Sequence, residues 1–325
     1  MMETPEQSLP VSLTEIRASE ERVRTMAIRT PLIRLNMEDV PAEIYLKLEN
    51  LQPVGAYKIR GAANAVLKAV SETGVKAVWT ASSGNLARAV AWVARRLGVK
   101  CHVVVPEFAT KVKLDAIAGL GAQITQVPTD HWFEILKTHH YTGMSGYFIH
   151  PVADLDIMAG HGTMGLELFA ELPEMDAVII PYGGGGLTVG LGSALRALKP
   201  KISIYACEVE TAAPLAAALK MGKPCAVEYK PSFVDGIGAR GRPVLPEMWP
   251  RVKSLVNGSL VVSISAVASA IRLLIDHNHI VAEGAGAAPV AAALGGGAEG
   301  RKIVAIVSGG NIDKSTLVRI LDYKL

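Results

Sequence analysis

The chain has 325 residues, half of them hydrophobic, and a formal net charge of +3. This length is too great for one small core and suits two domains, or one large α/β domain with an insertion. No dense basic block is present, which argues against nucleic-acid binding, and no uninterrupted run of about 18 apolar residues predicts a membrane span.

The cysteines and the N-terminal segment bear on the compartment. Cys101, Cys207 and Cys225 are odd in number and far apart in the sequence, which is typical of reduced thiols and not of a disulfide framework. Residues 1–25 contain no apolar segment of the kind that signal peptides carry. We therefore expect a cytoplasmic protein.

Short strand-like runs alternate with longer helical ones from residue 75 onward. The expected strands are 76–81, 101–106, 123–128, 147–151, 176–181, 202–210, 259–263 and 302–307. The expected helices are 85–98, 109–121, 130–140, 156–172, 187–198, one that begins at 212, and 265–277. Repeated strand–helix–strand units predict an α/β fold in which parallel sheets carry helices on both faces.

The pattern also suggests a division into two domains. The strands between residues 77 and 153 make a self-contained unit, which we predict to be a small domain that carries a substrate-carboxylate loop. Residues 1–76 and 154–325 would form the larger domain. Right-handed crossovers place the loops that lead from strands to helices along one edge of each sheet, where ligands of such folds bind.

A glycine-rich loop is the first of three candidate ligand-binding loops. Gly183 to Gly186 lie between an expected strand and an expected helix. Glycine lets backbone N–H groups approach an anion, and a helix N-terminus favours negative charge, so the loop predicts a phosphate site. A plain tight turn remains an alternative. Glu208 ends the next expected strand, so a dinucleotide site also remains open.

Two further loops carry hydroxyl and amide groups at strand ends. Ser82, Ser83 and Asn85 in "TASSGN" either cap the following helix or form an anion pocket suited to a carboxylate. Ser308 in "AIVSGGN" is either a turn residue or a hydrogen-bond partner for a ring nitrogen. Lys58 in "PVGAYKIRGA" is by itself either a solvated charge or a nucleophile.

Taken in order, these motifs resemble those of the fold-type II pyridoxal-phosphate enzymes. The branch is that of the threonine and serine dehydratases, with serine racemase and phenylserine dehydratase as relatives. The resemblance runs from "RTPLIRL" at 29–35 to "SGGN" at 308–311 and includes "KLENLQPVGAYKIRGA", "SSGN", "GGGGL", "VDGIG" and "EGAGA". It implies the tryptophan synthase β-like fold, with two open, twisted, mostly parallel sheets and helices on both faces.

The resemblance assigns a role to each candidate residue. Lys58 would form the Schiff base with pyridoxal 5′-phosphate and remove the substrate's α-proton, and Ser83 would be the second acid or base of a racemase. Asn85 would bond the cofactor's 3′-oxygen, and Ser308 would face its pyridine nitrogen. The residues implied to hold the phosphate are Gly183, Gly184, Gly185, Gly186 and Leu187. The residues implied to bind the substrate are Ser82, Ser83, Gly84, Asn85 and Leu86.

The implied activity is that of a lyase. A dehydratase, or ammonia-lyase, would remove water from L-threonine, L-serine or an aryl-serine such as phenylserine, giving a 2-oxo acid and ammonia. An amino-acid racemase is the alternative, and a protein that keeps the cofactor without turnover is a third reading. Leu86 stands where the family usually has histidine, which either admits a bulkier β-substituent or has no effect on the substrate.

The remaining expectations concern ions and partners. Glu208 and Ala212 match the family's cation ligands, but Pro214 replaces the second acid, so we expect at most a weak or monovalent cation. The histidines at 139–140 and 277–279 are expected at helix ends and not at a metal. The expected partner is a small amino-acid substrate, with neither nucleic acid nor membrane, and the expected state is a homodimer or a monomer.

Overall fold

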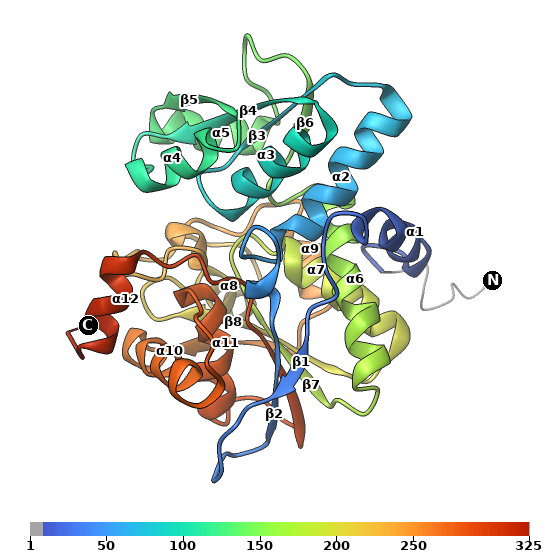
Figure 1. The fold of residues 1–325 in the computed structure, drawn as a ribbon. Coiled ribbons are helices and arrows are strands. Elements are labelled where there is room, and N and C mark those ends of the chain that lie inside the picture. The colour runs from blue at the N-terminus through green and yellow to red at the C-terminus, as the bar shows by residue number, and fades with distance from the viewer. Residues whose placement is uncertain (1–8, 325) are drawn as a thin grey trace.

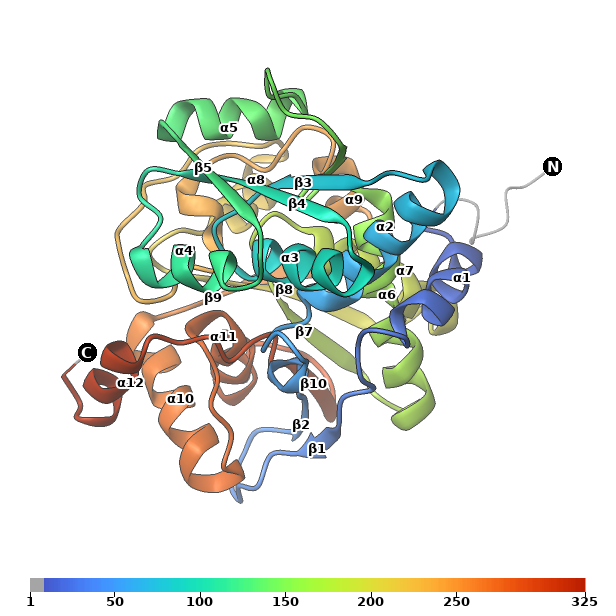
Figure 2. The ribbon, with the colours of Figure 1, turned by 45° about the horizontal axis from the view of Figure 1, so that its top comes forward.

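The computed structural model describes residues 9–324 as two sheets with helices packed against them (Figures 1 and 2). The six-stranded sheet has the order β1-β2-β10-β7-β8-β9, and the four-stranded sheet at the top of Figure 1 has the order β5-β4-β3-β6. Strands β1 and β2 pair antiparallel, and the other pairs within this described range are parallel. The predicted α/β architecture is therefore confirmed.

The strands of the two sheets come from different parts of the chain. The six-stranded sheet contains β1 (Leu32–Arg34), β2 (Glu43–Lys47), β7 (Ala177–Pro181), β8 (Ser203–Val209), β9 (Gly258–Val262) and β10 (Lys302–Ile306). The four-stranded sheet contains β3 (Ala77–Ala81), β4 (Lys100–Pro106), β5 (Gln123–Val127) and β6 (Tyr147–Ile149). The exact domain boundaries stay a prediction, and residues 1–8 and 325 of the predicted ranges lie outside the described residues.

The helices predicted at 85–98, 109–121, 130–140, 156–172, 187–198, from 212 and at 265–277 are all present, whereas the helices before residue 75, the short one at 249–253 and the last one were not predicted. The helices are α1 (Leu13–Val23), α2 (Lys58–Thr73), α3 (Asn85–Leu97), α4 (Lys111–Ala118), α5 (Thr129–Thr138), α6 (Leu155–Glu171), α7 (Gly186–Leu198), α8 (Pro214–Met221), α9 (Trp249–Lys253), α10 (Ile264–Asn278), α11 (Gly284–Leu294) and α12 (Lys314–Leu321). Two short 3₁₀ helices are η2 (Glu49–Leu51) and η3 (Gly238–Gly241). Within residues 9–324, no helix has both the length and the apolar character needed to cross a membrane.

Local side-chain and backbone chemistry sets the helix ends. The Asp154 carboxylate accepts hydrogen bonds from the first N–H groups of α6, and the Ser263 hydroxyl does the same for α10. His139 and His279 end α5 and α10 in the left-handed conformation, with φ of 57° at each. The prediction that these two histidines lie at helix ends is therefore confirmed.

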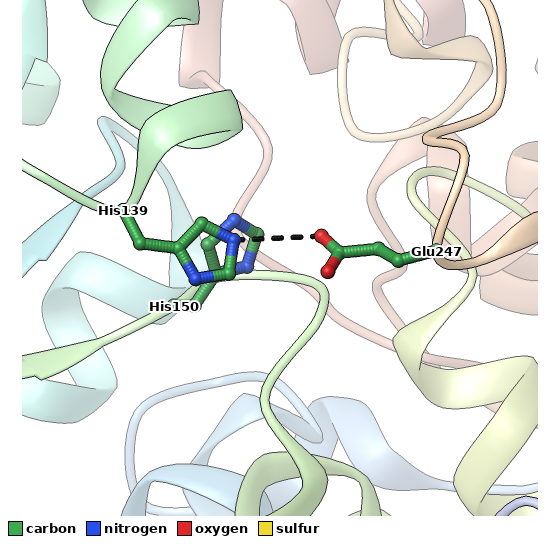
Figure 3. Close-up of side chains that lie close together, drawn as sticks. All are labelled: His139, His150 and Glu247. Atoms are coloured by element: carbon green, nitrogen blue, oxygen red, sulfur yellow. Dashed lines mark ion pairs between the residues drawn. The ribbon is translucent and has the colours of Figure 1, made fainter.

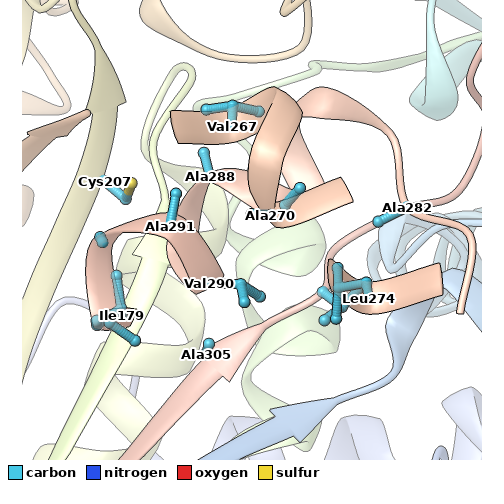
Figure 4. Close-up of a cluster of buried hydrophobic side chains, with 14 of the residues drawn as sticks. Ile179, Cys207, Val267, Ala270, Leu274, Ala282, Ala288, Val290, Ala291 and Ala305 are labelled. Carbon is cyan, nitrogen blue, oxygen red and sulfur yellow. The ribbon is translucent and has the colours of Figure 1, made fainter. Parts of the chain in front are cut away.

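Helices α10 and α11 pack on the six-stranded sheet through small side chains (Figure 4). Ala288 and Ala291 of α11 and Ala270 of α10 lie in one buried cluster with Ile179 of β7 and Cys207 of β8. Alanine at these positions lets the helices lie close to the strands, so the interior is filled without large side chains. Burial raises the pKa of the Cys207 thiol, so this cysteine is an inert part of the core.

Glycines allow an equally close contact between helices α6 and α7. A Cβ atom added to Gly190 would lie 2.0 Å from the backbone oxygen of Met158. A Cβ atom added to Gly160 would lie 2.4 Å from the backbone oxygen of Arg60. Because backbone atoms cannot move aside as a flexible side chain can, these positions fix the spacing between α2, α6 and α7, the helices that lead into and away from the candidate loops.

We expect Gly190→Ala to lower the free energy of unfolding by about 3 kcal/mol or more, because the new methyl group would force α6 and α7 apart. Gly192→Ala in the same helix is the matched control, since its Cβ would come nearest to the flexible end of Leu255, at 3.3 Å, and to no backbone atom closer than that. Urea unfolding followed by circular dichroism measures both variants. Equal midpoints for the two would contradict this account of the helix contact.

Candidate active site

Lys58 begins α2, and the segment before it pairs with the segment that follows β10. The N–H of Tyr57 donates to the backbone oxygen of Ser308 at 3.0 Å, and Ala56 forms an antiparallel bridge with Gly309. Ser308 is buried, and Lys58 is partly buried with its Nζ 5.0 Å from the Tyr57 ring centroid. The backbone thus holds the lysine loop beside the serine loop, although they are far apart in the sequence.

A buried ionic network anchors the first turn of α2. The Arg60 guanidinium donates to both carboxylate oxygens of Glu49 at 2.8 Å and to those of Glu167 at 2.7 and 2.9 Å. Burial alone would raise the pKa of Glu49, but the charge and hydrogen bonds of Arg60 hold that pKa below its usual range. Such a network is stable only while every member is paired, so it fixes the helix that presents Lys58.

The four-glycine loop leaves a helix N-terminus open. No described side chain caps α7, and its N-cap residue Gly185 has a φ of 98°, which favours glycine. A Cβ atom at Gly184 would lie 2.4 Å from Cγ2 of Val152, and one at Gly186 would lie 3.1 Å from the Val152 backbone oxygen. Backbone N–H groups without side chains around them are what an anion such as phosphate requires.

The loop between β3 and α3 is also left open. Within the described part of the chain no side chain caps α3, whose N-cap residue is Gly84, and the one local bond runs from the Gly84 N–H to the Ser82 Oγ at 3.3 Å. The N–H groups of this helix are therefore free for a carboxylate. Leu86, by contrast, is 2% exposed and packs in the core that contains Ile59, which favours the reading without effect on the substrate.

Asn85 belongs to a polar cluster that sequence reasoning did not single out. Its Oδ1 accepts a hydrogen bond from Nδ2 of Asn311 at 2.8 Å, and its Nδ2 donates to Oε1 of Glu283 at 2.9 Å. Glu283 is the acid of "EGAGA", and Asn311 is the amide of "SGGN". An acid at the start of an otherwise small and apolar helix was the available signal, because such an acid needs a partner.

Glu208 behaves as a helix cap in this structure. Its carboxylate accepts hydrogen bonds from the N–H groups of Leu215 and Ala216 in α8, at 2.9 and 2.8 Å, and from the Ser259 hydroxyl at 2.7 Å. Burial raises the pKa of Glu208, which these bonds lower in part. Both oxygens of the Glu208 carboxylate already accept hydrogen bonds. The weak cation site with Ala212 stays a prediction.

Figure 3 shows a second group of side chains with metal-ligating atoms, His139, His150 and Glu247. The Nε2 of His139 lies 3.4 Å from Oε1 of Glu247. The His150 ring, however, has both nitrogens engaged, with Nε2 against the Leu136 backbone oxygen at 2.9 Å and Nδ1 accepting from backbone N–H groups. Burial lowers the pKa of His150 to about 4, so this imidazole is a neutral structural contact.

The residues brought together fit a phosphorylated cofactor that reacts with an amine. The open helix N-terminus at Gly183 to Gly186 and the buried Ser308 follow the carboxyl ends of the parallel strands β7 and β10. Lys58 lies at the start of α2, and the segment before it pairs with the segment around Ser308. The buried Thr188 hydroxyl in the first turn of α7 has no hydrogen-bond partner among residues 9–324. These features define a site of the pyridoxal-phosphate class.

Comparisons with known proteins agree with this class. The family described as pyridoxal-phosphate dependent enzyme matches residues 23–309. The chain therefore belongs to that family, and pyridoxal 5′-phosphate is its cofactor. The fold-type II resemblance predicted from the motifs is confirmed.

Individual relatives cover nearly the whole chain. An L-threonine ammonia-lyase of Thermotoga maritima is 34% identical over 321 residues, which is 97% of this chain and 79% of that protein. A catabolic L-threonine dehydratase of Staphylococcus aureus is 33% identical, over 97% of this chain and 93% of that protein. The solved structure of maize serine racemase has a TM-score of 0.85 at 31% identity and covers 97% of this chain and 98% of its own.

We expect Arg60→Met to cost about 3–5 kcal/mol of stability at neutral pH, because it leaves the buried Glu49 charge without its partner. The deficit should shrink as the pH falls, since protonation then removes that charge. Lys68→Met in the same helix is the control: its ion pair with Asp156 is partly exposed, at 30% and 24%, and we expect a loss under about 1 kcal/mol. Urea unfolding at pH 5 and pH 8 measures the loss of stability in each variant. A loss in Arg60→Met no larger than the loss in Lys68→Met would contradict the anchoring role.

Proposed function

We propose that the chain is a pyridoxal-phosphate dependent ammonia-lyase that removes water from L-threonine or L-serine and yields a 2-oxo acid and ammonia. The observation that carries the proposal is the pairing of the Lys58 loop with the Ser308 loop, through the Tyr57 N–H and the Ala56–Gly309 bridge. The predicted lyase class is confirmed by the threonine ammonia-lyase and dehydratase relatives.

Each site residue has a physical role in this reaction. The cofactor, when bound, withdraws the electrons left by removal of the substrate's α-proton. In this proposal the Lys58 amine accepts that proton, and Gly183 to Gly186 with the start of α7 bind the phosphate. The open N-terminus of α3, at Ser83 to Asn85, binds the substrate carboxylate. After the β-hydroxyl leaves as water, the free enamine is hydrolysed to the 2-oxo acid and ammonia.

A neutral hydroxyl partner for the ring nitrogen favours elimination. Ser308 is a weaker partner for a protonated ring nitrogen than a carboxylate would be, so the ring stabilises negative charge less. Rapid loss of a β-leaving group is then favoured over a long-lived carbanion. Leu86 is buried among core side chains, which supports the reading in which it has no effect on the substrate, so we place threonine and serine ahead of phenylserine.

Racemisation is the second candidate function. It is supported by the likeness to maize serine racemase and by Ser83, which lies in the substrate loop and is only partly buried. In this reading Lys58 and Ser83 would exchange the α-proton on opposite sides of the substrate. The cytoplasmic location, the homodimeric or monomeric state and a weak monovalent cation stay predictions.

The test is an assay for 2-oxo acid with L-threonine, L-serine, phenylserine and 3-hydroxyaspartate, joined to chiral chromatography of the remaining amino acid. We expect 2-oxo acid from L-threonine and L-serine. We also expect an absorbance band at the violet edge of the visible spectrum, lost in Lys58→Ala together with activity and kept in Lys68→Met. Racemic serine without 2-oxo acid would favour the racemase, and a protein without the band would contradict both.

A further inference from the structure

Asn85, Asn311 and Glu283 form a chain of hydrogen bonds whose direction is fixed from one end. The Val54 backbone oxygen can only accept, and it accepts from Nδ2 of Asn311 at 2.9 Å. The second proton of that nitrogen goes to Oδ1 of Asn85 at 2.8 Å. The amide of Asn85 must therefore turn its Nδ2 toward Glu283, whose Oε1 accepts at 2.9 Å.

This chain leaves one group of Asn85 free to bind a ligand. The amide nitrogen carries two protons, and Glu283 receives only one of them. Asn85 is partly exposed at the open start of α3, whereas the carboxylate of Glu283 packs against Gly309, where an added Cβ would lie 2.6 Å from Oε1. The remaining N–H of Asn85 is thus a donor in the site, directed by residues behind it.

We propose that Glu283 is a positioning residue that, with Asn311, turns the Asn85 amide so that its free N–H donates to the oxygen on the cofactor ring. In the same proposal, the charge of Glu283 changes the protonation equilibrium of that ring. The inference rests on the proposed function only in that a pyridoxal ring lies beside Asn85. It adds a proton-holding carboxyl group to the site, which the motif roles alone do not contain.

The surroundings of Glu283 make its charge adjustable. Burial raises the pKa of its carboxyl group to about 7, the bond from Asn85 lowers it in part, and the charges of Asp235 and Lys113 act in opposite directions. Arg88 of α3 also interacts with Glu283 through its charge. The carboxyl group is therefore neutral below about pH 7 and ionised above it. Ionisation places a negative charge near the ring oxygen and favours the protonated form of the ring system.

The first experiment follows the absorbance of the holoprotein from about pH 5 to about pH 9. We expect the wild type to show a step near the pKa of Glu283, which is about 7. The step should vanish in Glu283→Gln, which keeps an acceptor for Asn85 but cannot ionise. Glu299→Gln, at an exposed position, is the control and should keep the step. A step that persists in Glu283→Gln would overturn the proposal.

Two surface variants test the same point without disturbing the buried network. Asp235 and Lys113 form an ion pair with each other, and both are partly or largely exposed. Because Asp235 raises and Lys113 lowers the pKa of Glu283, Asp235→Asn should move the step to lower pH and Lys113→Gln to higher pH, each by about 0.3 pH unit or more. Shifts in the same direction, or no shift in either, would overturn the proposal even if Glu283→Gln failed to fold.

Cofactor affinity separates positioning from charge. Glu283→Leu removes the acceptor and should raise the cofactor dissociation constant about tenfold or more, whereas Glu283→Gln should stay within about threefold of the wild type, as equilibrium dialysis would measure. Unchanged affinity in Glu283→Leu would overturn the positioning role. If the step behaves as expected but no substrate yields 2-oxo acid, the proposed function fails and this inference stands. If 2-oxo acid forms but the step survives Glu283→Gln, the reverse holds.

Discussion

The placement of the active site depends on the ion pairs that the buried Arg60 guanidinium forms with Glu49 and Glu167. The guanidinium joins Glu49, just after β2, to Glu167 of α6 and so ties the six-stranded sheet to the helix that begins with Lys58. Desolvated charges are costly unless each has a partner in good geometry, so few arrangements of these elements satisfy all of them. The first turn of α2 is fixed for that reason. Lys58 belongs to this turn, since it precedes Arg60 by two residues in the sequence.

Close backbone contact is the second constraint, and glycine makes it possible. Gly160 and Gly190 let α2, α6 and α7 cross at distances that a methyl group would prevent. The start of α7 follows the end of β7 directly in the chain, and there Gly183 to Gly186 leave N–H groups open to an anion. The paired loops before Lys58 and around Ser308 complete the site, since the backbone itself carries the link between them.

Periodicity predicted most of the fold because alternation between buried strands and amphipathic helices is a local property. It did not extend to the residues before 75, so α1, β1, β2 and α2 were not predicted. Strands β1 and β2 pair antiparallel and lie outside the strand–helix–strand repeat on which the prediction rested. It predicted His139 and His279 at helix ends but not the approach of His139 to His150 and Glu247, which no sequence spacing encodes. Leu86 stood out as a departure in a motif, and only its burial showed that it belongs to the core.

The order of the motifs around Lys58, Gly183 to Gly186 and Ser308 was enough, by itself, to determine the family, the cofactor and the expected chemistry. Those features depend on residue types and their order, which the sequence contains in full. The tertiary structure alone decided that Asn311 and Glu283 direct Asn85 and that Glu283 holds a proton near neutral pH. Hydrogen-bond direction depends on which distant groups meet, and a carboxyl pKa depends on the loss of water around it, and both arise only when the chain is folded.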